Sequence, residues 1–221
     1  MAYIVLEGPK NIGKAQAIDS IVRYEANKGN IVCDIRRLPK LNRSPPNIPR
    51  LIQTADTFIT QEPTHLDIGT FIRNELLPKN TRQYNEESIA HAFALDRENH
   101  LKHIVDPLLR NGKKVIQKRN YLSSLIYQTT QKMTYETVLN LSGNKLGKNK
   151  MPNHTFILTK EEKPNNQPVK SGYSVNQEIN KAYQKNIHRH LDDMSADYTS
   201  IESKSLDETV QNVLSAYKKQ F

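Results

Sequence analysis

A strand, a glycine-containing loop and a helix open this chain, and their order constrains its fold more than any other feature. The stretch YIVLEGPKNIGKAQ covers residues 3–16. Its apolar first half predicts a buried strand, and the apolar residues that follow recur at three- and four-residue steps, as in a helix. Gly8, Gly13 and Lys14 fit the phosphate-binding pattern G-x-x-x-x-G-K-[S/T], but the final position is Ala15.

Such a loop binds phosphate because its backbone N–H groups and the helix N-terminus together attract an anion, while the lysine reaches the outer phosphates. The other interpretation is an ordinary glycine-containing turn with an exposed lysine. The residues predicted to bind ATP are Gly8, Pro9, Lys10, Asn11, Ile12, Gly13, Lys14 and Ala15.

The rest of the chain continues to alternate between strands and helices. Further strands are predicted near residues 30–35, 56–60, 111–119, 154–159 and 197–202, and helices near 68–77, 86–110, 122–132, 175–191 and 206–217. This order predicts an α/β fold with a parallel sheet covered by helices on both faces. The length of 221 residues favours a single domain over 1–221. Proline-containing residues 36–55 are expected to form an insertion without regular structure.

The formal net charge of +9 suits either nucleic acid or phosphorylated small molecules. The basic residues are scattered and do not alternate with aromatic residues, which disfavours a single-strand nucleic-acid binder. The single Cys33 excludes an intramolecular disulfide and suits a reducing, cytoplasmic compartment. No apolar run is long enough to span a membrane, and the N-terminus lacks the pattern of a signal peptide.

Three later motifs are more specific than the loop. They read QEPTHLDIGTFIRNELL, HAFALDRENH and KKVIQKRNYLSSLIYQ. In this order and with these internal spacings they resemble the thymidylate kinase family of P-loop nucleoside monophosphate kinases. The resemblance implies a three-layer α/β/α fold with a central five-stranded parallel sheet. It also implies ATP and dTMP as ligands and Mg²⁺ as a cofactor. Members often form homodimers, so a second copy is one candidate partner.

The resemblance also assigns roles to residues of the acceptor site. Phe93 matches the aromatic residue that stacks on thymine, and Arg97, one helical turn on, matches the arginine that hydrogen-bonds the base edge. Arg73 and Arg119 match the arginines that hold the acceptor phosphate, a role that suits the guanidinium fork. Taken singly, each could be an ordinary core or surface residue, so the inference rests on the set. The other dTMP-binding residues that the resemblance implies are Glu62, Ser124 and Gln128.

The departures from the family concentrate where metal and transferring phosphate meet. Lys10 replaces an acidic residue, Ala15 replaces Ser or Thr, and Lys118 replaces the acid of the D-R-Y motif. Each change removes an oxygen ligand or a negative charge, so no protein metal ligand is predicted. The two lysines could partly stand in for the cation in an altered kinase, or the chain could bind nucleotide without transferring phosphate. The residues expected to act in catalysis are Lys14, Lys118 and Arg119.

The expected lid, near residues 160–174, is shorter than the arginine-rich lid of some family members. Lys163 and Lys170 are its candidate cations, and it contains no arginine. A lysine supplies charge but not a bidentate clamp. Three functions therefore stay open: a dTMP kinase-like enzyme of nucleotide biosynthesis, a catalytically impaired nucleotide-binding homologue, and a nucleic-acid-binding protein on a borrowed fold.

Overall fold

The computed structural model describes residues 1–221 except 39–45, 79–80, 131–132 and 162–175. The described residues form one six-stranded sheet in the order β2-β3-β4-β1-β5-β6, with every neighbouring pair parallel. The strands are β1 (Ala2–Glu7), β2 (Val32–Asp34), β3 (Thr57–Gln61), β4 (Lys114–Lys118), β5 (His154–Lys160) and β6 (Tyr198–Ser203).

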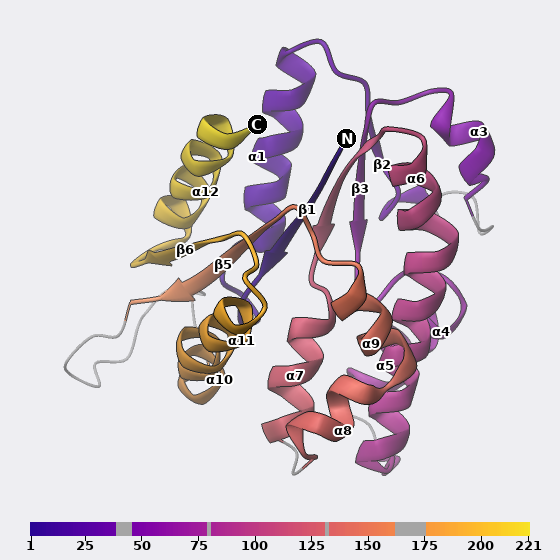
Figure 1. Ribbon diagram of the computed structural model, residues 1–221, viewed down its shortest axis with the longest axis vertical. Helices are drawn as coiled ribbons and strands as arrows, with labels where there is room; N and C mark the ends of the chain where they lie inside the picture. Colours follow the sequence, from indigo (N-terminus) through magenta and orange to yellow (C-terminus); the bar gives the residue numbers. More distant parts are fainter. Residues whose placement is uncertain (39–45, 79–80, 131–132, 162–175) are drawn as a thin grey trace.

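Helices connect successive strands (Figure 1). Three segments continue a helix with π-type hydrogen bonding and are labelled η. The helical elements are α1 (Lys14–Asn27), α3 (Ile48–Ile52), α4 (Asp67–Phe71), η1 (Ile72–Leu76), α5 (Glu86–His100), η2 (Leu101–Val105), α6 (Asp106–Arg110), α7 (Tyr121–Thr130), α8 (Tyr135–Asn140), α9 (Ser142–Asn149), α10 (Gln177–Ala182), η3 (Tyr183–Ile187), α11 (His188–Asp193) and α12 (Leu206–Gln220).

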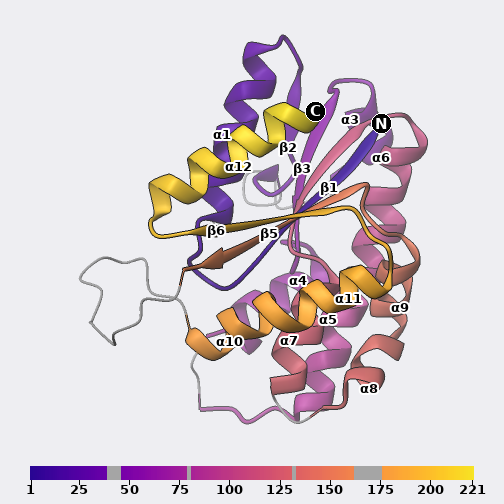
Figure 2. The same cartoon turned by 60° about the vertical axis from the view of Figure 1, so that its left-hand side comes forward.

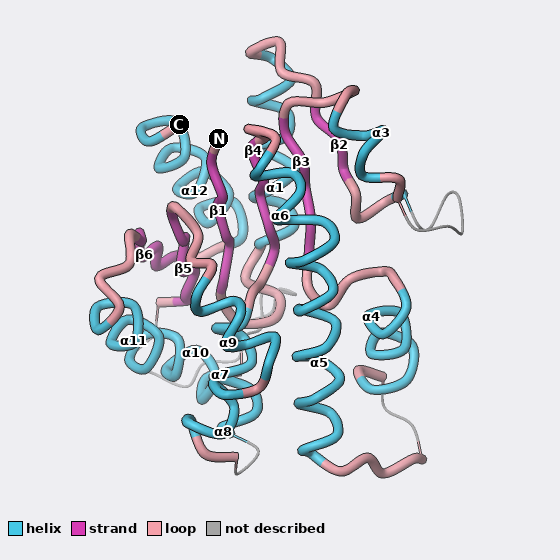
Figure 3. Tube along the Cα trace, turned by 45° about the vertical axis from the view of Figure 1, so that its right-hand side comes forward, coloured by secondary structure: helices cyan, strands magenta, loops and turns pink. Residues whose placement is uncertain are grey.

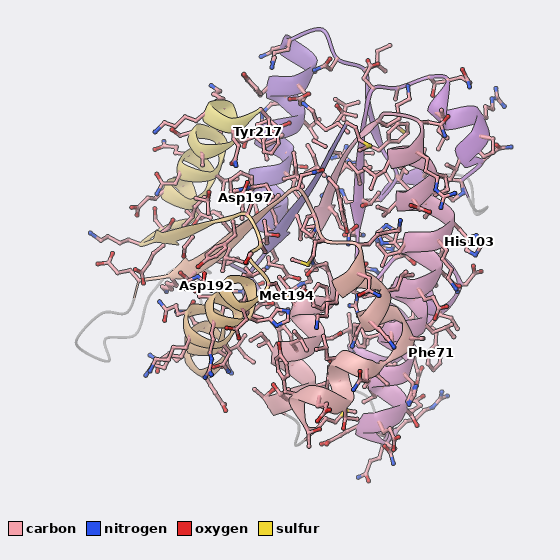
Figure 4. All side chains as sticks on the ribbon, in the orientation of Figure 1. Phe71, His103, Asp192, Met194, Asp197 and Tyr217 are labelled. Carbon is pink, nitrogen blue, oxygen red and sulfur yellow. The ribbon has the colours of Figure 1, made fainter. Side chains whose placement is uncertain are left out.

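The helices form two layers, one on each face of the sheet (Figure 2). On one face α1 and α12 pack over the strands, and Tyr217, labelled in Figure 4, is fully buried between them. On the other face α3, η2 and α6 cover the β2–β1 half, while α7, η3 and α11 cover the β5 end. Both faces of the central strands are buried, which explains the nearly continuous apolar runs in their sequences.

The prediction of a three-layer α/β/α fold with a parallel sheet is confirmed, but the prediction of five strands is wrong. β6 pairs with β5 from Thr155↔Tyr198 to Lys160↔Ser203 and adds a sixth strand. Its residues alternate between exposed and buried near its end, as expected for an edge strand that is covered on one face only.

The region 36–55 is more ordered than the expected irregular insertion. Its described part contains α3, where the Asn47 side chain accepts a hydrogen bond from the backbone N–H of Arg50 at 3.1 Å. Pro49 lies in the first turn, where a missing N–H costs nothing because that group has no partner inside the helix. Ile48 and Ile52 are buried against the sheet. The helices α8 and α9 also had no counterpart in the sequence prediction.

The carboxyl ends of β1, β3 and β4 meet at one edge of the sheet. Leu6 and Gln61 both lie beside Lys118 in the strand register. Figure 3 shows these strands side by side, with α5 and α7 below their ends. In open α/β sheets, ligands bind at this edge.

Candidate functional site

The loop between β1 and α1 takes a shape that glycine permits. Gly8 and Gly13 have φ values of 143° and 96°, and Asn11 has a φ of 66°. A Cβ atom on Gly8 would lie 2.3 Å from the carbonyl oxygen of Leu158. Any larger residue at position 8 would therefore push the loop away from β5, which explains why this position is a glycine.

Lys14 is buried at the start of α1 and folds back over this loop. Its Nζ donates hydrogen bonds to the carbonyl oxygens of Gly8 at 2.7 Å and Pro9 at 2.5 Å. Burial, together with the charges of Arg119 and Lys118, holds the pKa of the Lys14 ammonium well below its usual range. An anion beside this group would restore its charged form, because opposite charge favours ionisation.

Arg97 lies at the centre of a buried polar network behind the loop. Its Nε donates to Glu62 at 2.7 Å and its Nη1 donates to Ser124 at 3.1 Å and to Asn144. Glu62 also accepts from Gln117 at 3.0 Å. Burial alone would raise the pKa of Glu62, but the charge of Arg97 and the contact with His100 bring it below its usual value.

Arg73 and Arg119, expected to hold the acceptor phosphate, both reach the same cavity. Arg73 donates to the carbonyl oxygens of Thr64, at 2.8 Å, and Pro63. Arg119, with a φ of 69°, donates to the Ser123 hydroxyl at 2.8 Å. Arg73 has no carboxylate within hydrogen-bonding distance among the described residues. The Nη1 of Arg119 lies 3.9 Å from the buried Glu7 carboxylate, too far for a hydrogen bond, so both guanidiniums can still donate to an anion.

Phe93 on α5 and Gln128 on α7 line the same cavity as the loop. Phe93 is half-buried and its ring contributes an apolar wall. Gln128 is buried, and its Oε1 has no hydrogen-bond partner in the described structure. A buried acceptor without a partner costs free energy, and a ligand N–H would satisfy it.

These side chains surround one cavity of about 990 Å³. This volume lies at the upper end of the range for small-molecule sites. Among the described residues that line it, seven are basic and two acidic, so the cavity favours anions. The basic residues are Lys10, Lys14, Arg73, Arg97, Lys118, Arg119 and Lys204, and the acidic residues are Glu62 and Asp207.

The cavity gathers most of the residues that the sequence singled out. Gly8 and Pro9 lie behind the loop surface and do not line it, although their carbonyls bind Lys14. Lys163 and Lys170, the candidate lid residues, lie outside the described part of the chain. The predicted residues that do line the cavity are Lys10, Asn11, Ile12, Gly13, Lys14, Ala15, Glu62, Arg73, Phe93, Arg97, Lys118, Arg119, Ser124 and Gln128.

Glu7 is the main residue that sequence reasoning missed. Its carboxylate is fully buried and accepts hydrogen bonds from the Asn120 backbone N–H at 2.7 Å, the Ser123 hydroxyl at 2.9 Å and the Tyr183 hydroxyl at 2.9 Å. It thereby joins the phosphate loop to the segment that carries Arg119. The sequence feature that could have identified Glu7 is a carboxylate at the end of an apolar strand, because such a group is rarely buried without a partner.

The turn before α12 was also missed, because nothing in its sequence distinguishes it from a surface turn. Lys204, Ser205, Leu206 and Asp207 line the cavity beside the phosphate loop. Leu206 lies so close to Gly13 that a Cβ there would meet its Cδ1 at 2.7 Å. The packing of α12 on α1 brings this turn to the site.

A family model described as thymidylate kinase matches residues 48–213. This chain belongs to the thymidylate kinase family. The matched region begins after the phosphate-binding loop, in agreement with the unusual residues of that loop. The chain is 38% identical over 129 residues to a probable thymidylate kinase of Pyrococcus horikoshii, covering 57% of this chain and 51% of the relative. It is 36% identical over 113 residues to the thymidylate kinase of Aster yellows witches'-broom phytoplasma, covering 51% and 54%.

These alignments span about half the length of the curated relatives. The fold is similar to the crystal structure of thymidylate kinase from Ehrlichia chaffeensis over 98% of both chains, with a TM-score of 0.65 and 17% identity. At this identity the likeness supports the fold alone. Where the structure describes the chain, every helix falls short of the length and hydrophobicity that crossing a bilayer requires.

Thymidylate kinases use ATP and typically Mg²⁺, but the residues present here do not fit a protein-bound magnesium ion. No group of three or more His, Cys, Asp or Glu side chains comes together within the described residues. The Ala15 methyl cannot coordinate a cation, and Lys118 lies at the end of β4 inside the cavity. At 4 Å and an effective dielectric constant near 20, an ammonium and a divalent cation repel each other by about 8 kcal/mol.

Proposed function

We propose that this chain is a dTMP kinase-like phosphotransferase that moves the γ-phosphoryl group of ATP to dTMP or a closely related deoxynucleoside monophosphate. The observation that carries the proposal is the single cavity shared by the phosphate loop, the paired arginines and the wall formed by Phe93 and Gln128. A cavity that combines a phosphate loop, two arginines and an aromatic ring suits two nucleotides that meet through their phosphates.

In this proposal Lys14 and the loop N–H groups hold the β- and γ-phosphates of ATP. Arg73 and Arg119 hold the acceptor phosphate. Phe93 stacks on the base, while the free Gln128 Oε1 accepts a hydrogen bond from the base N–H. Arg97 is committed to Glu62, Ser124 and Asn144, so it shapes the base end of the cavity through these partners.

The reaction needs no proton abstraction by the protein. A phosphate oxygen of dTMP attacks the γ-phosphorus, the bond between that phosphorus and the β–γ bridging oxygen breaks, and ADP leaves with the electron pair. Catalysis of such a transfer rests on alignment and on stabilisation of the charge on the transferring group. Lys14, Lys118 and Arg119 supply positive charge at the cavity surface for that purpose.

A second candidate is a family member that binds the nucleotides but does not transfer phosphate, acting as a sensor, scaffold or regulatory protein. The observation that favours it is that, within the described residues, no three or more His, Cys, Asp or Glu side chains come together as a metal site. Both candidates predict dTMP binding, and they differ only in turnover.

A coupled assay of ADP release with ATP, dTMP and Mg²⁺ tests the proposal, alongside calorimetric titration of dTMP into the same preparation. The phosphotransferase predicts ADP release that depends on dTMP and falls roughly 10²–10³-fold in Lys14→Met. Binding of dTMP with no ADP release above that variant would favour the second candidate. A preparation that binds no dTMP would contradict both.

A further inference from the structure

Lys118 occupies a central position at the nucleotide-binding edge of the sheet. It is the last residue of β4, and β4 lies between β1 and β3. Its carbonyl oxygen accepts a hydrogen bond from the backbone N–H of Glu62 at 3.0 Å, which fixes the backbone at this point. The side chain is half-buried and lines the cavity beside Lys14 and Arg119.

The charges around Lys118 are mostly of its own sign. Arg73, Arg36 and Arg119 repel its ammonium, while Asp19 on α1 attracts it. Asp19 is itself held by Arg36, whose Nη2 lies 3.2 Å from its Oδ1. Within the described part of the chain, no carboxylate forms an ion pair with Lys118.

Burial, with the charges of those three arginines, lowers the pKa of Lys118 to about 8. A desolvated ammonium beside other cations is unfavourable in the free protein. An anion placed between Lys118 and its neighbours stabilises the desolvated ammonium and offsets its repulsion by the arginines. The arrangement therefore resembles a phosphate-binding site more than a structural lysine.

We propose that Lys118, together with Lys14 and Lys10, provides the charge neutralisation that nucleotide phosphates require, so that the cavity binds metal-free nucleoside triphosphate at least as tightly as its magnesium complex. The inference rests on the proposed function, because it assumes that the phosphates of ATP reach this edge of the sheet. Metal-free ATP carries two more negative charges than its magnesium complex, and a cationic cavity attracts the more negative form more strongly.

The replacement of a metal ion by lysine side chains explains why the three departures from the family pattern, at Lys10, Ala15 and Lys118, occur together. A methyl group at Ala15 leaves the cation position without an oxygen, and an ammonium at Lys118 fills the same region with positive charge. Lys10 is exposed at the loop and also lines the cavity. In combination, these residues replace a metal ion by side-chain charges.

The test is calorimetric titration of ATP into the full-length protein, once with EDTA and once with excess Mg²⁺. The wild-type Kd in EDTA should equal or lie below the Kd with Mg²⁺. Lys118→Met should weaken metal-free ATP about tenfold and the magnesium complex less. The double variant Ala15→Ser/Lys118→Asp should bind the magnesium complex at least tenfold more tightly than metal-free ATP.

Lys145→Met is the matched control, because Lys145 is exposed on α9 and does not line the cavity. It should leave both Kd values unchanged, and a thermal melt of each variant verifies folding. A wild-type protein that binds ATP tenfold more tightly with Mg²⁺ than in EDTA would overturn the inference and leave the proposed function standing. Failure of the same preparation to bind dTMP would instead overturn the proposed function.

Discussion

The two halves of the cavity use their charged residues in opposite ways. In the base half, which Glu62, Phe93, Arg97 and Gln128 line, Arg97 is 2% exposed and its guanidinium is occupied by Glu62 and its neighbours. In the phosphate half, the Lys14 ammonium donates to backbone carbonyls of its own loop, and among the described residues Lys118 has no carboxylate partner. The first half is organised by internal pairing, whereas the second holds positive charge for an external anion.

This difference separates residues that build the site from residues that act on the ligand. Removal of an internally paired charge should reduce stability, because its partner is left buried and alone. Removal of an unpaired cation should reduce binding and turnover with little loss of stability. The five predictions below test that division, in order of decreasing expected effect.

Arg97→Met should lower the free energy of unfolding by about 3–5 kcal/mol, because the buried Glu62 loses its guanidinium partner and keeps its contacts with Gln117 and His100. Urea denaturation measures the change. Arg110→Met is the control, since Arg110 is exposed and pairs with Asp106 on the surface of α6 at 2.8 Å. The control should lose less than about 1 kcal/mol. A loss below about 1 kcal/mol in Arg97→Met would show that internal pairing does not hold the base half together.

Lys14→Met should lower kcat roughly 10²–10³-fold, the usual effect of removing one charge-stabilising donor from a transition state. The free energy of unfolding should change by less than about 1 kcal/mol, because the lowered pKa of Lys14 indicates that its charge is not well stabilised in the free protein. The rate of ADP release and a urea denaturation curve give the two numbers. A large loss of stability with unchanged kcat would assign Lys14 to the scaffold.

Gln128→Leu should raise the Kd for dTMP about 5- to 100-fold, because the ligand N–H would lose its acceptor at a cost of about 1–3 kcal/mol. Stability should not fall, since Gln128 Oε1 has no internal partner to lose. Gln53→Leu, at an exposed position after α3, is the control. An unchanged Kd for dTMP in Gln128→Leu would place the base elsewhere.

The affinity for metal-free ATP should fall less than tenfold between pH 7 and pH 9. The pKa of Lys118 is about 8 in the free protein, where Arg36, Arg73 and Arg119 repel its charge and Asp19 attracts it. A bound phosphate raises that pKa. The contribution of the Lys118 charge to the affinity for metal-free ATP is therefore complete below pH 8 and is lost as the pH rises above 8.

Calorimetry across this pH range measures the decline, and Lys118→Arg separates Lys118 from the other titrating groups. Arginine stays charged at these pH values, so this variant should show a flatter profile than the wild type. Identical profiles in both proteins would assign the decline to another group, with Lys14 the first candidate.

Lys118→Met should raise the free energy of unfolding at pH 7 by up to about 1 kcal/mol. The folded pKa of Lys118, about 8, lies below the usual lysine value of 10.5, so its charge is unfavourable below pH 8. That penalty fades as the pH rises from 8 to 10.5. The stabilisation by the variant should therefore be smaller at pH 10 than at pH 7. A destabilised variant would indicate a structural role for the ammonium.

The sequence predicted the layers, the parallel sheet and most cavity residues because these depend on local periodicity and on motifs with fixed spacing. It placed Lys118 and Ala15 at the phosphate end for the same reason. It missed the hydrogen bonds of Glu7 and the turn at Lys204, because both depend on packing between segments far apart in the chain. The internal pairing of Arg97 with Asn144 was also unpredictable, because α9 had no recognisable signal.

A single-turnover experiment with protein in excess over γ-labelled ATP, in the presence of dTMP, tests the proposed phosphotransferase most directly. It detects even one slow transfer per site, so a low rate cannot hide the chemistry. We expect label in dTDP with the wild type, and label that appears roughly 10²–10³-fold more slowly with Lys14→Met. Label that stays in ATP while calorimetry shows dTMP bound to the same protein would contradict the proposed transfer and identify a nucleotide-binding member of the thymidylate kinase family.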